Sequence, residues 1–493
     1  MAVPVDTFFL DPDTQGTLQA RIQQMIASAI LSGRLQPGEK LPSSRGLAKH
    51  LSVSRITVTL AYAELVASDY LNARDRSGYY VSDTAPRPPE LPPSAPSNSA
   101  VDWGRLVTRT SREAITKKPT DWAGYKYPFI YGQPDTELFD HSNWRLCAIR
   151  ALGQKDYASL TADQYDADDP QLITFIARHI LPRRGIAARP DEILITMGAQ
   201  NALWLSAQVL LTQRRRAAIE NPCYPALRAI LEQARCSLTE VDVDEAGMPP
   251  ARIPDDVDVI FATPSHQSPT NATMKLRRRK RLLSRAQQIG AVVVEDDYEF
   301  EMSFLQPPLP ALKSLDHDGR VIYIGSFSKS IFPGLRLGYL VGPEPFIREA
   351  RALRSLVLRH PPGLMQRAVA YFLSLGHYDA QVTRMGRTLQ DRRSTMETAI
   401  QAHGLSVAGS GDFGGSSFWM RAPIGVDTEE LAKTLAPQGV LIEPGAPFFS
   451  ATHRPAEFYR LGYSSIPSAR IPEGIARIAA SIDAMGTSGA KNA

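Results

Sequence analysis

One short stretch of the sequence, SFSKSIFPGLRLG, carries a lysine among groups that can bind an anion. The hydroxyls of Ser326 and Ser328 can donate hydrogen bonds to a phosphate, and Arg336 adds a fixed charge that binds it through two bonds. Lys329 lies between them in an otherwise largely apolar segment. We expect a lysine that is shielded from water beside an arginine to have a lowered pKa, which makes its amine a nucleophile towards an aldehyde.

A second segment, VVVEDDYEF, puts carboxylates directly after an apolar run. A carboxylate at the end of a strand can pair with a protonated ring nitrogen, and Tyr298 can donate a hydrogen bond to a ring hydroxyl. Asp296 and Asp297 compete for the first role, and the spacing does not decide between them. The structural alternative for this acidic pair is to cap the end of the strand.

A third segment, TMGAQNAL, puts Gly198, Ala199 and Gln200 between a predicted strand and a predicted helix. Free backbone N–H groups at the start of a helix can bind a phosphate. A reactive lysine, an acidic partner for a pyridinium and a phosphate cradle together describe a site for pyridoxal 5′-phosphate. We expect no metal site.

These segments must be positioned by a sheet. Four stretches that contain or adjoin them begin as β-branched apolar runs and end in polar residues: EILITMGAQNALWLSAQVLL, VDVIFATPSHQSPT, AVVVEDDYEF and RVIYIGSFSKS. That pattern predicts an α/β domain with a mostly parallel sheet that helices cover on both faces. Ligands bind at the carboxyl ends of the strands in such sheets, which is where the polar residues lie.

In the first eighty residues, apolar residues recur with the three- and four-residue spacing of helices. TLQARIQQMIASAILSGRLQPG predicts an amphipathic helix that stops at Gly33, and LPSSRGLAKHL predicts a second, shorter helix. A third helix opens at Ser54. Two short extended runs then flank a turn that contains Gly78, which predicts a β-hairpin. The whole is a winged helix-turn-helix.

In a winged helix-turn-helix, the start of the third helix enters the major groove of DNA. Ser54, Arg55 and Thr57 lie at that start, and Arg45 on the second helix can contact phosphates. Further candidates for such contacts are Thr59, Lys49 and, at the tip of the wing, Arg76. For each residue alone, the alternative is a solvated surface position.

Length and composition indicate at least two domains. The chain has 493 residues, 43 % of them hydrophobic, and a net charge of +4, so a nucleic-acid surface must be a local patch. The proline-dense DTAPRPPELPPSAPSN predicts an extended linker. We expect a winged helix at 10–83, a linker at 84–100 and a large domain at 101–486.

The sequence also indicates a compartment. The three cysteines show no CxxC spacing, and there is neither a signal peptide at the start nor an apolar run long enough to cross a membrane. These features predict a cytoplasmic protein with no membrane partner.

Residues 17–82, with GRLQPGEKLPSSRGLAKHLSVSRITVTLAYAELVASDYL, resemble the winged helix of the GntR family, which implies DNA binding through Arg45, Ser54, Arg55 and Thr57. The large unit resembles fold-type I aminotransferases, with a small C-terminal α/β subdomain. The two together resemble the MocR subfamily of GntR regulators.

The resemblance implies a role for each matching residue of the large unit. Lys329 matches the lysine that forms a Schiff base with pyridoxal 5′-phosphate, Asp296 the partner of its pyridine nitrogen, and Tyr298 the donor to its ring oxygen. Tyr224, in ENPCYPAL, matches the aromatic residue that stacks on the ring. Arg460, in YRLGY, matches the arginine that binds the acidic group of the substrate, here the effector.

The sequence departs from the family at several positions. Asp69 replaces a glycine before the wing, and Ser268 and Asn271 replace the asparagine and glycine of the Asn-Pro-Thr-Gly pattern. The run YDADDPQL also lacks the glycine of a Tyr-Gly-Asp-Pro pattern. These changes favour binding of the cofactor over aminotransferase turnover.

Two classes of function follow. The first is a transcriptional regulator, a homodimer on double-stranded operator DNA, whose aminotransferase-like domain senses a small amine, such as an amino acid or taurine, and controls its catabolism. EDDYEFEMSFL and ALRSLVLRHPPG resemble regulators of taurine or ectoine catabolism. The second is an active aminotransferase with a DNA-binding appendage. A regulator of vitamin B6 synthesis that senses the cofactor itself needs only the same lysine.

Overall fold

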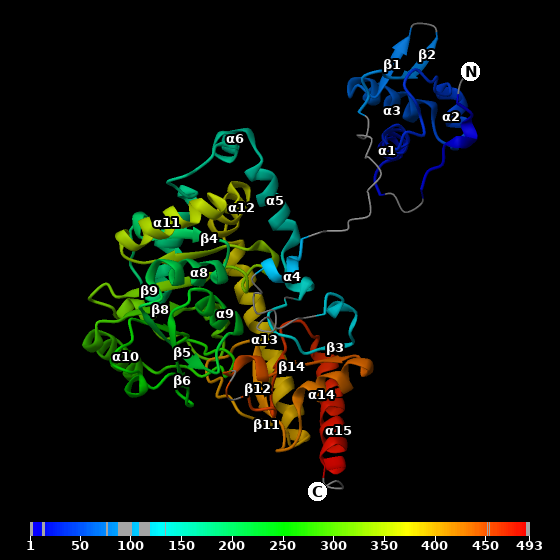
Figure 1. Ribbon diagram of the computed structural model, residues 1–493. Helices are drawn as coiled ribbons and strands as arrows, with labels where there is room; N and C mark the ends of the chain where they lie inside the picture. The colour runs from blue at the N-terminus through cyan, green and yellow to red at the C-terminus, as the bar shows by residue number, and fades with distance from the viewer. Residues whose placement is uncertain are drawn as a thin grey trace. The chain divides into compact units, whose positions relative to one another are not determined.

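The computed structural model describes residues 3–11, 15–74, 77–86, 101–107, 119–133, 135–450, 452 and 454–489. The chain divides into two compact units, Met1–Thr108 and Arg109–Ala493 (Figure 1). Arg76 and most of the predicted linker lie outside the described residues. Within the described part of the chain, no helix is long and apolar enough to span a membrane.

The first unit is a winged helix, as predicted. Its helices and strands are α1 (Leu18–Leu31), α2 (Ser44–His50), α3 (Arg55–Ala67), β1 (Leu71–Arg74), β2 (Gly78–Val81) and α4 (Trp103–Leu106). The side chains of Thr17, Ser43 and Ser54 each accept a hydrogen bond from a backbone N–H in the first turn of α1, α2 and α3. Such caps replace bonds that a helix start cannot make for itself.

Asp69 has a left-handed backbone, with φ at +59°. This conformation is the one that glycine adopts without strain, and aspartate tolerates it better than most side chains. The backbone at Asp69 is therefore one that a glycine at this position would also allow.

The second unit is built on the predicted mostly parallel sheet. Seven strands lie in the order β4-β10-β9-β8-β7-β5-β6, and β10 alone is antiparallel to its neighbours. They are β4 (Ile193–Thr196), β5 (Arg216–Asn221), β6 (Ser237–Asp242), β7 (Val259–Ala262), β8 (Val292–Asp296), β9 (Val321–Ser326) and β10 (Gly338–Val341).

Helices cover both faces of this sheet because side chains along a strand alternate between faces. In β9, Ile322 and Ile324 pack with α8, α9 and α11, whereas Tyr323 packs with α5, α7 and α12 on the other face. The helices are α5 (His141–Ala151), α6 (Gln154–Thr161), α7 (Pro170–Phe175), α8 (Ala199–Leu210), α9 (Pro225–Gln233), α10 (Leu276–Ile289), α11 (Glu344–Leu358) and α12 (Gly363–Ser374).

A smaller C-terminal layer completes the unit. Four strands form an antiparallel sheet in the order β11-β12-β15-β14, and β13 pairs in parallel with β3. This sheet packs on α13, α14 and α15 through one apolar cluster. The bounds are β3 (Tyr127–Pro128), α13 (His377–Ala402), β11 (Ser406–Val407), β12 (Ser417–Arg421), α14 (Thr428–Leu435), β13 (Val440–Leu441), β14 (Glu443–Pro444), β15 (Phe458–Gly462) and α15 (Ile471–Gly489).

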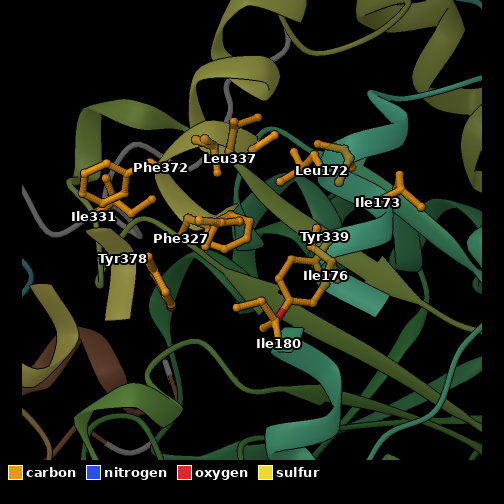
Figure 2. Close-up of a cluster of buried hydrophobic side chains, with 14 of the residues drawn as sticks. Leu172, Ile173, Ile176, Ile180, Phe327, Ile331, Leu337, Tyr339, Phe372 and Tyr378 are labelled. Carbon is orange, nitrogen blue, oxygen red and sulfur yellow. The ribbon is translucent and has the colours of Figure 1, made fainter. Parts of the chain in front are cut away.

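The loop from β9 to β10 is held by the core beneath it. Figure 2 shows Phe327, Ile331 and Leu337 of this segment among the buried side chains of α7, α12 and α13. All three are about 1 % exposed. Their burial fixes the backbone on both sides of Lys329, so the apolar residues of SFSKSIFPGLRLG position its polar ones.

Candidate functional site

A cavity of about 270 Å³ lies at the carboxyl ends of the parallel strands. It is lined by every large-unit residue that the sequence predicted for cofactor or effector binding: Ala199, Gln200, Tyr224, Asp296, Tyr298, Ser326, Ser328, Lys329, Arg336 and Arg460. The remaining lining residues were not predicted for these roles, and they include Tyr131, Ser268, Glu443 and Phe448.

The anion-binding side of the cavity joins the Lys329 loop to the start of α8. Arg336 has a left-handed backbone, with φ at +52°, and its Nη2 donates to the carbonyl of Met197 at 3.3 Å. Gly198 precedes α8 with φ at +81°, and no side chain caps this helix. Within the described residues, the buried Oγ of Ser328 has no hydrogen-bond partner. Uncapped N–H groups, a hydroxyl and a guanidinium thus converge, as phosphate binding requires.

The two adjacent aspartates differ in their surroundings. Arg184 Nε donates to Asp297 at 2.7 Å, and the Tyr323 hydroxyl donates to the same carboxylate at 2.8 Å. Asp296 is the last residue of β8 and lines the cavity, and its buried Oδ1 has no hydrogen-bond partner among the described residues. Because side chains alternate along an extended chain, only one of the two can point into the cavity.

Their pKa values move in opposite directions. Burial, and then the negative charges of Asp297 and Glu220, raise the pKa of Asp296 from 3.8 to about 7. Burial alone would also raise the pKa of Asp297, but Arg184 and the hydrogen bonds to the carboxylate hold it below its usual value. Asp297 therefore remains ionised near neutral pH, whereas Asp296 is poised to take up a proton or to meet a cation.

The ring of Tyr131 contacts two of the cationic side chains that line the cavity. Lys329 Nζ is 3.9 Å from the centre of its ring, and Arg460 Cζ is 4.1 Å from the same centre. The Tyr131 hydroxyl donates to Glu299 at 3.0 Å. An aromatic face attracts a cation, so this ring positions both side chains.

Arg460 has a carboxylate partner inside the protein. Its Nε donates to Glu443 Oε2 at 2.9 Å, and the backbone N–H of Tyr131 donates to the same oxygen at 3.1 Å. Both side chains are buried.

The substituted positions of the Asn-Pro-Thr-Gly pattern keep their local roles. Asn271 has φ at +59°, a left-handed conformation that glycine adopts without strain, and its Nδ2 donates to the carbonyl of Ser417 at 2.6 Å. Ser268 lines the cavity. Asparagine tolerates the left-handed conformation better than most residues, so the substitution at Asn271 is compatible with a backbone that glycine would also allow.

The winged helix presents a separate candidate interface. Arg45, Lys49 and Arg55 are exposed, and within the described residues none of them forms an ion pair. Ser54 caps α3, and its Oγ lies 2.7 Å from the hydroxyl of Thr57. The cationic side chains are thus available to phosphates or bases, while these two hydroxyls are bonded to each other.

Comparison with known proteins decides the family. Residues 147–478 match the class I and II aminotransferases, and residues 18–81 match the gntR family of bacterial regulatory proteins. The HTH-type transcriptional regulator TauR of Rhodobacter capsulatus is 57 % identical over 97 % of this chain and 99 % of its own. The chain belongs to the MocR-type transcriptional regulators.

Other relatives agree with that family. The probable rhizopine catabolism regulatory protein MocR of Rhizobium meliloti is 29 % identical to this MocR-type regulator, over 98 % of this chain and 97 % of its own. Among solved structures, the α-aminoadipate aminotransferase LysN of Thermus thermophilus, complexed with N-(5′-phosphopyridoxyl)-L-leucine, has a TM-score of 0.70 and 27 % identity. The match covers 78 % of this chain and all of that one.

Proposed function

We propose that this transcriptional regulator binds pyridoxal 5′-phosphate in the Lys329 cavity. The observation that carries the proposal is that one cavity brings together the lysine amine, an anion-binding helix start, and two buried polar atoms, Asp296 Oδ1 and Ser328 Oγ, that have no hydrogen-bond partner within the described residues. The phosphate would be held by Ser326, Ser328, Arg336 and the N–H groups of Ala199 and Gln200. Bound there, the cofactor would supply an aldehyde that a primary amine can attack.

The pyridine nitrogen is assigned to Asp296. A protonated ring nitrogen beside Asp296 would stabilise its ionised form and offset the burial that raises its pKa. Asp297 is engaged by Arg184 and Tyr323, which argues against it as the ring partner. Tyr298 would donate to the ring hydroxyl, and Tyr224 would cover the ring face.

The effector is proposed to be a small molecule with both an amine and an acidic group, taurine in the first instance. The amine is needed to compete with Lys329 for the aldehyde, and the acidic group would accept hydrogen bonds from the Nη groups of Arg460. Glu443 keeps Nε of Arg460 occupied, so the acidic group meets a guanidinium that is already oriented. The 57 % identity to TauR supports taurine as the first candidate.

We further propose that the protein is a homodimer on duplex DNA. The helix α5 exposes Leu146 and Ile149, and Leu152 follows at its C-cap; the three are spaced three residues apart and are 54–61 % exposed. A contiguous apolar stripe of this kind marks an interface more often than a free surface. Two copies would present two winged helices, each of which contacts DNA through Arg45, Ser54, Arg55 and Thr57.

The sensing step can be tested with matched ligands. Full-length protein loaded with cofactor is titrated with taurine, ethanolamine and ethanesulfonate while the visible absorption is recorded. Taurine has the amine and the acid, ethanolamine only the amine, and ethanesulfonate only the acid. We expect taurine to change the spectrum at the lowest concentration and ethanesulfonate to leave it unchanged. In Arg460→Ala, the advantage of taurine over ethanolamine should disappear; equal responses of the wild-type protein to both amines would remove Arg460 from effector recognition.

A further inference from the structure

The recognition helix exposes apolar side chains that its own domain does not use. Ile56 is 72 % exposed and Leu60, one turn later, is 50 % exposed. The core of the winged helix takes Val58, Tyr62 and Leu65 from the opposite side of α3. Two large apolar side chains, four residues apart, therefore share one solvent-facing strip of α3.

The hydroxyls beside that strip are already bonded within the helix. Ser54 Oγ accepts the backbone N–H of Thr57 at 3.1 Å and also bonds the Thr57 hydroxyl. Thr59 Oγ1 donates to the backbone carbonyl of Arg55 at 2.9 Å. In the first two turns of α3, Arg55 is therefore the charged side chain that can donate hydrogen bonds to DNA, and the apolar side chains of Ile56 and Leu60 are exposed near it.

We propose that Ile56, with Leu60 behind it, reads the C5-methyl groups of thymine in the major groove. This inference rests on the proposed DNA binding by α3. Thymine carries the one apolar group in the major-groove pattern of bases, and aliphatic side chains recognise it by contact. The exposed cations Arg45 and Lys49, which have no ion pair within the described residues, complement the phosphates beside the groove. The occupant of the apolar strip is therefore duplex DNA with thymine at a fixed position.

The experiment removes the methyl group alone. Full-length wild-type protein first selects a binding site from a library of randomised duplexes. Each thymine of the selected site is then replaced in turn by deoxyuridine, which lacks only the C5-methyl. One uracil position should weaken wild-type binding about fourfold, as the loss of one buried methyl group predicts. Ile56→Ser should bind the thymine and uracil duplexes equally.

A matched control is Leu18→Ser, which removes an apolar side chain that is 45 % exposed on α1. This variant should keep the wild-type difference between thymine and uracil. If the protein selects a site but no uracil replacement in that site weakens binding, the proposed methyl contact is overturned while the proposed DNA binding stands. If Ile56→Ser kept the full preference for thymine over uracil, another residue would contact the methyl group, and the proposed role of Ile56 would be overturned as well. If the wild-type protein enriches no sequence, the proposed DNA binding itself fails.

Discussion

Replacing Asp296 by asparagine should change the pH dependence of stability in a predictable direction. In the cofactor-free protein, burial and the neighbouring charges raise the pKa of Asp296 from its ordinary 3.8 to about 7. Between these values the unfolded carboxyl is ionised while the folded one is protonated. The folded state therefore binds more protons, and the stability that this proton supports is lost as the pH rises towards 7.

The magnitude follows from the size of the shift. Between pH 5 and pH 7, Asp296 should take about 2.3 kcal/mol from the stability of the folded state, because the slope is about 1.4 kcal/mol per pH unit near pH 5 and falls to about half of that at the pKa. Asp296→Asn lacks this titration. The difference in unfolding free energy between Asp296→Asn and the wild-type protein should therefore rise by about that amount from pH 5 to pH 7 and then level off.

The assay is urea unfolding of cofactor-free protein at several pH values. Asp391→Asn, which changes an exposed carboxyl on α13, serves as the matched control and should give a flat difference. With cofactor bound, Asp296→Asn should instead be less stable than the wild-type protein, because it lacks the charge proposed to pair with the ring nitrogen. A difference curve for Asp296→Asn that is flat between pH 5 and pH 7 would refute the assignment of Asp296 as the buried, unpartnered acid.

Three further outcomes are expected. Lys329→Ala should lose the visible absorption of the cofactor-loaded protein while its circular dichroism stays unchanged; retained absorption would mean that another amine binds the cofactor. Arg55→Ala should lower affinity for a selected DNA site by about 1–3 kcal/mol, whereas replacing Arg34, an exposed cation just beyond α1, by alanine should not. Equal affinities of Arg55→Ala and the wild-type protein would remove Arg55 from the interface. Ile149→Asp should convert a dimer into monomers in sedimentation at micromolar concentration, unlike Ile424→Asp at an isolated position that is 90 % exposed; a wild-type monomer would contradict the dimer.

The sequence predicted those parts of the site that are contiguous in the chain. Apolar and polar residues alternate through the Lys329 loop, because the apolar ones enter the core and leave the polar ones on the cavity wall. The same reasoning located the start of α8 and the end of β8. The winged helix followed from its helical periodicity and caps.

Other parts of the site depend on contacts between distant segments. Tyr131 and Glu443 are more than 300 residues apart, and β14, which carries Glu443, has two residues and no strand pattern of its own. The choice between Asp296 and Asp297 depends on Arg184, which reaches Asp297 from a segment beyond α7. On α3, the sequence suggested polar contacts by hydroxyls, whereas the structure gives those hydroxyls bonds within the helix and leaves Ile56 exposed.

The most direct test of the regulator is whether the Lys329 cavity controls DNA affinity. The dissociation constant of cofactor-loaded, full-length protein for its selected duplex is measured with and without saturating taurine, in the wild-type protein and in Lys329→Ala. Because coupling between two sites is reciprocal, an effector that binds the cavity and acts on DNA must change this constant. We predict a change of about fivefold or more in the wild-type protein, the lower end of typical couplings, and none in Lys329→Ala. The account would be contradicted if taurine changed the dissociation constant equally in both proteins. It would also be contradicted if no amine that alters the wild-type spectrum changed the dissociation constant of either protein.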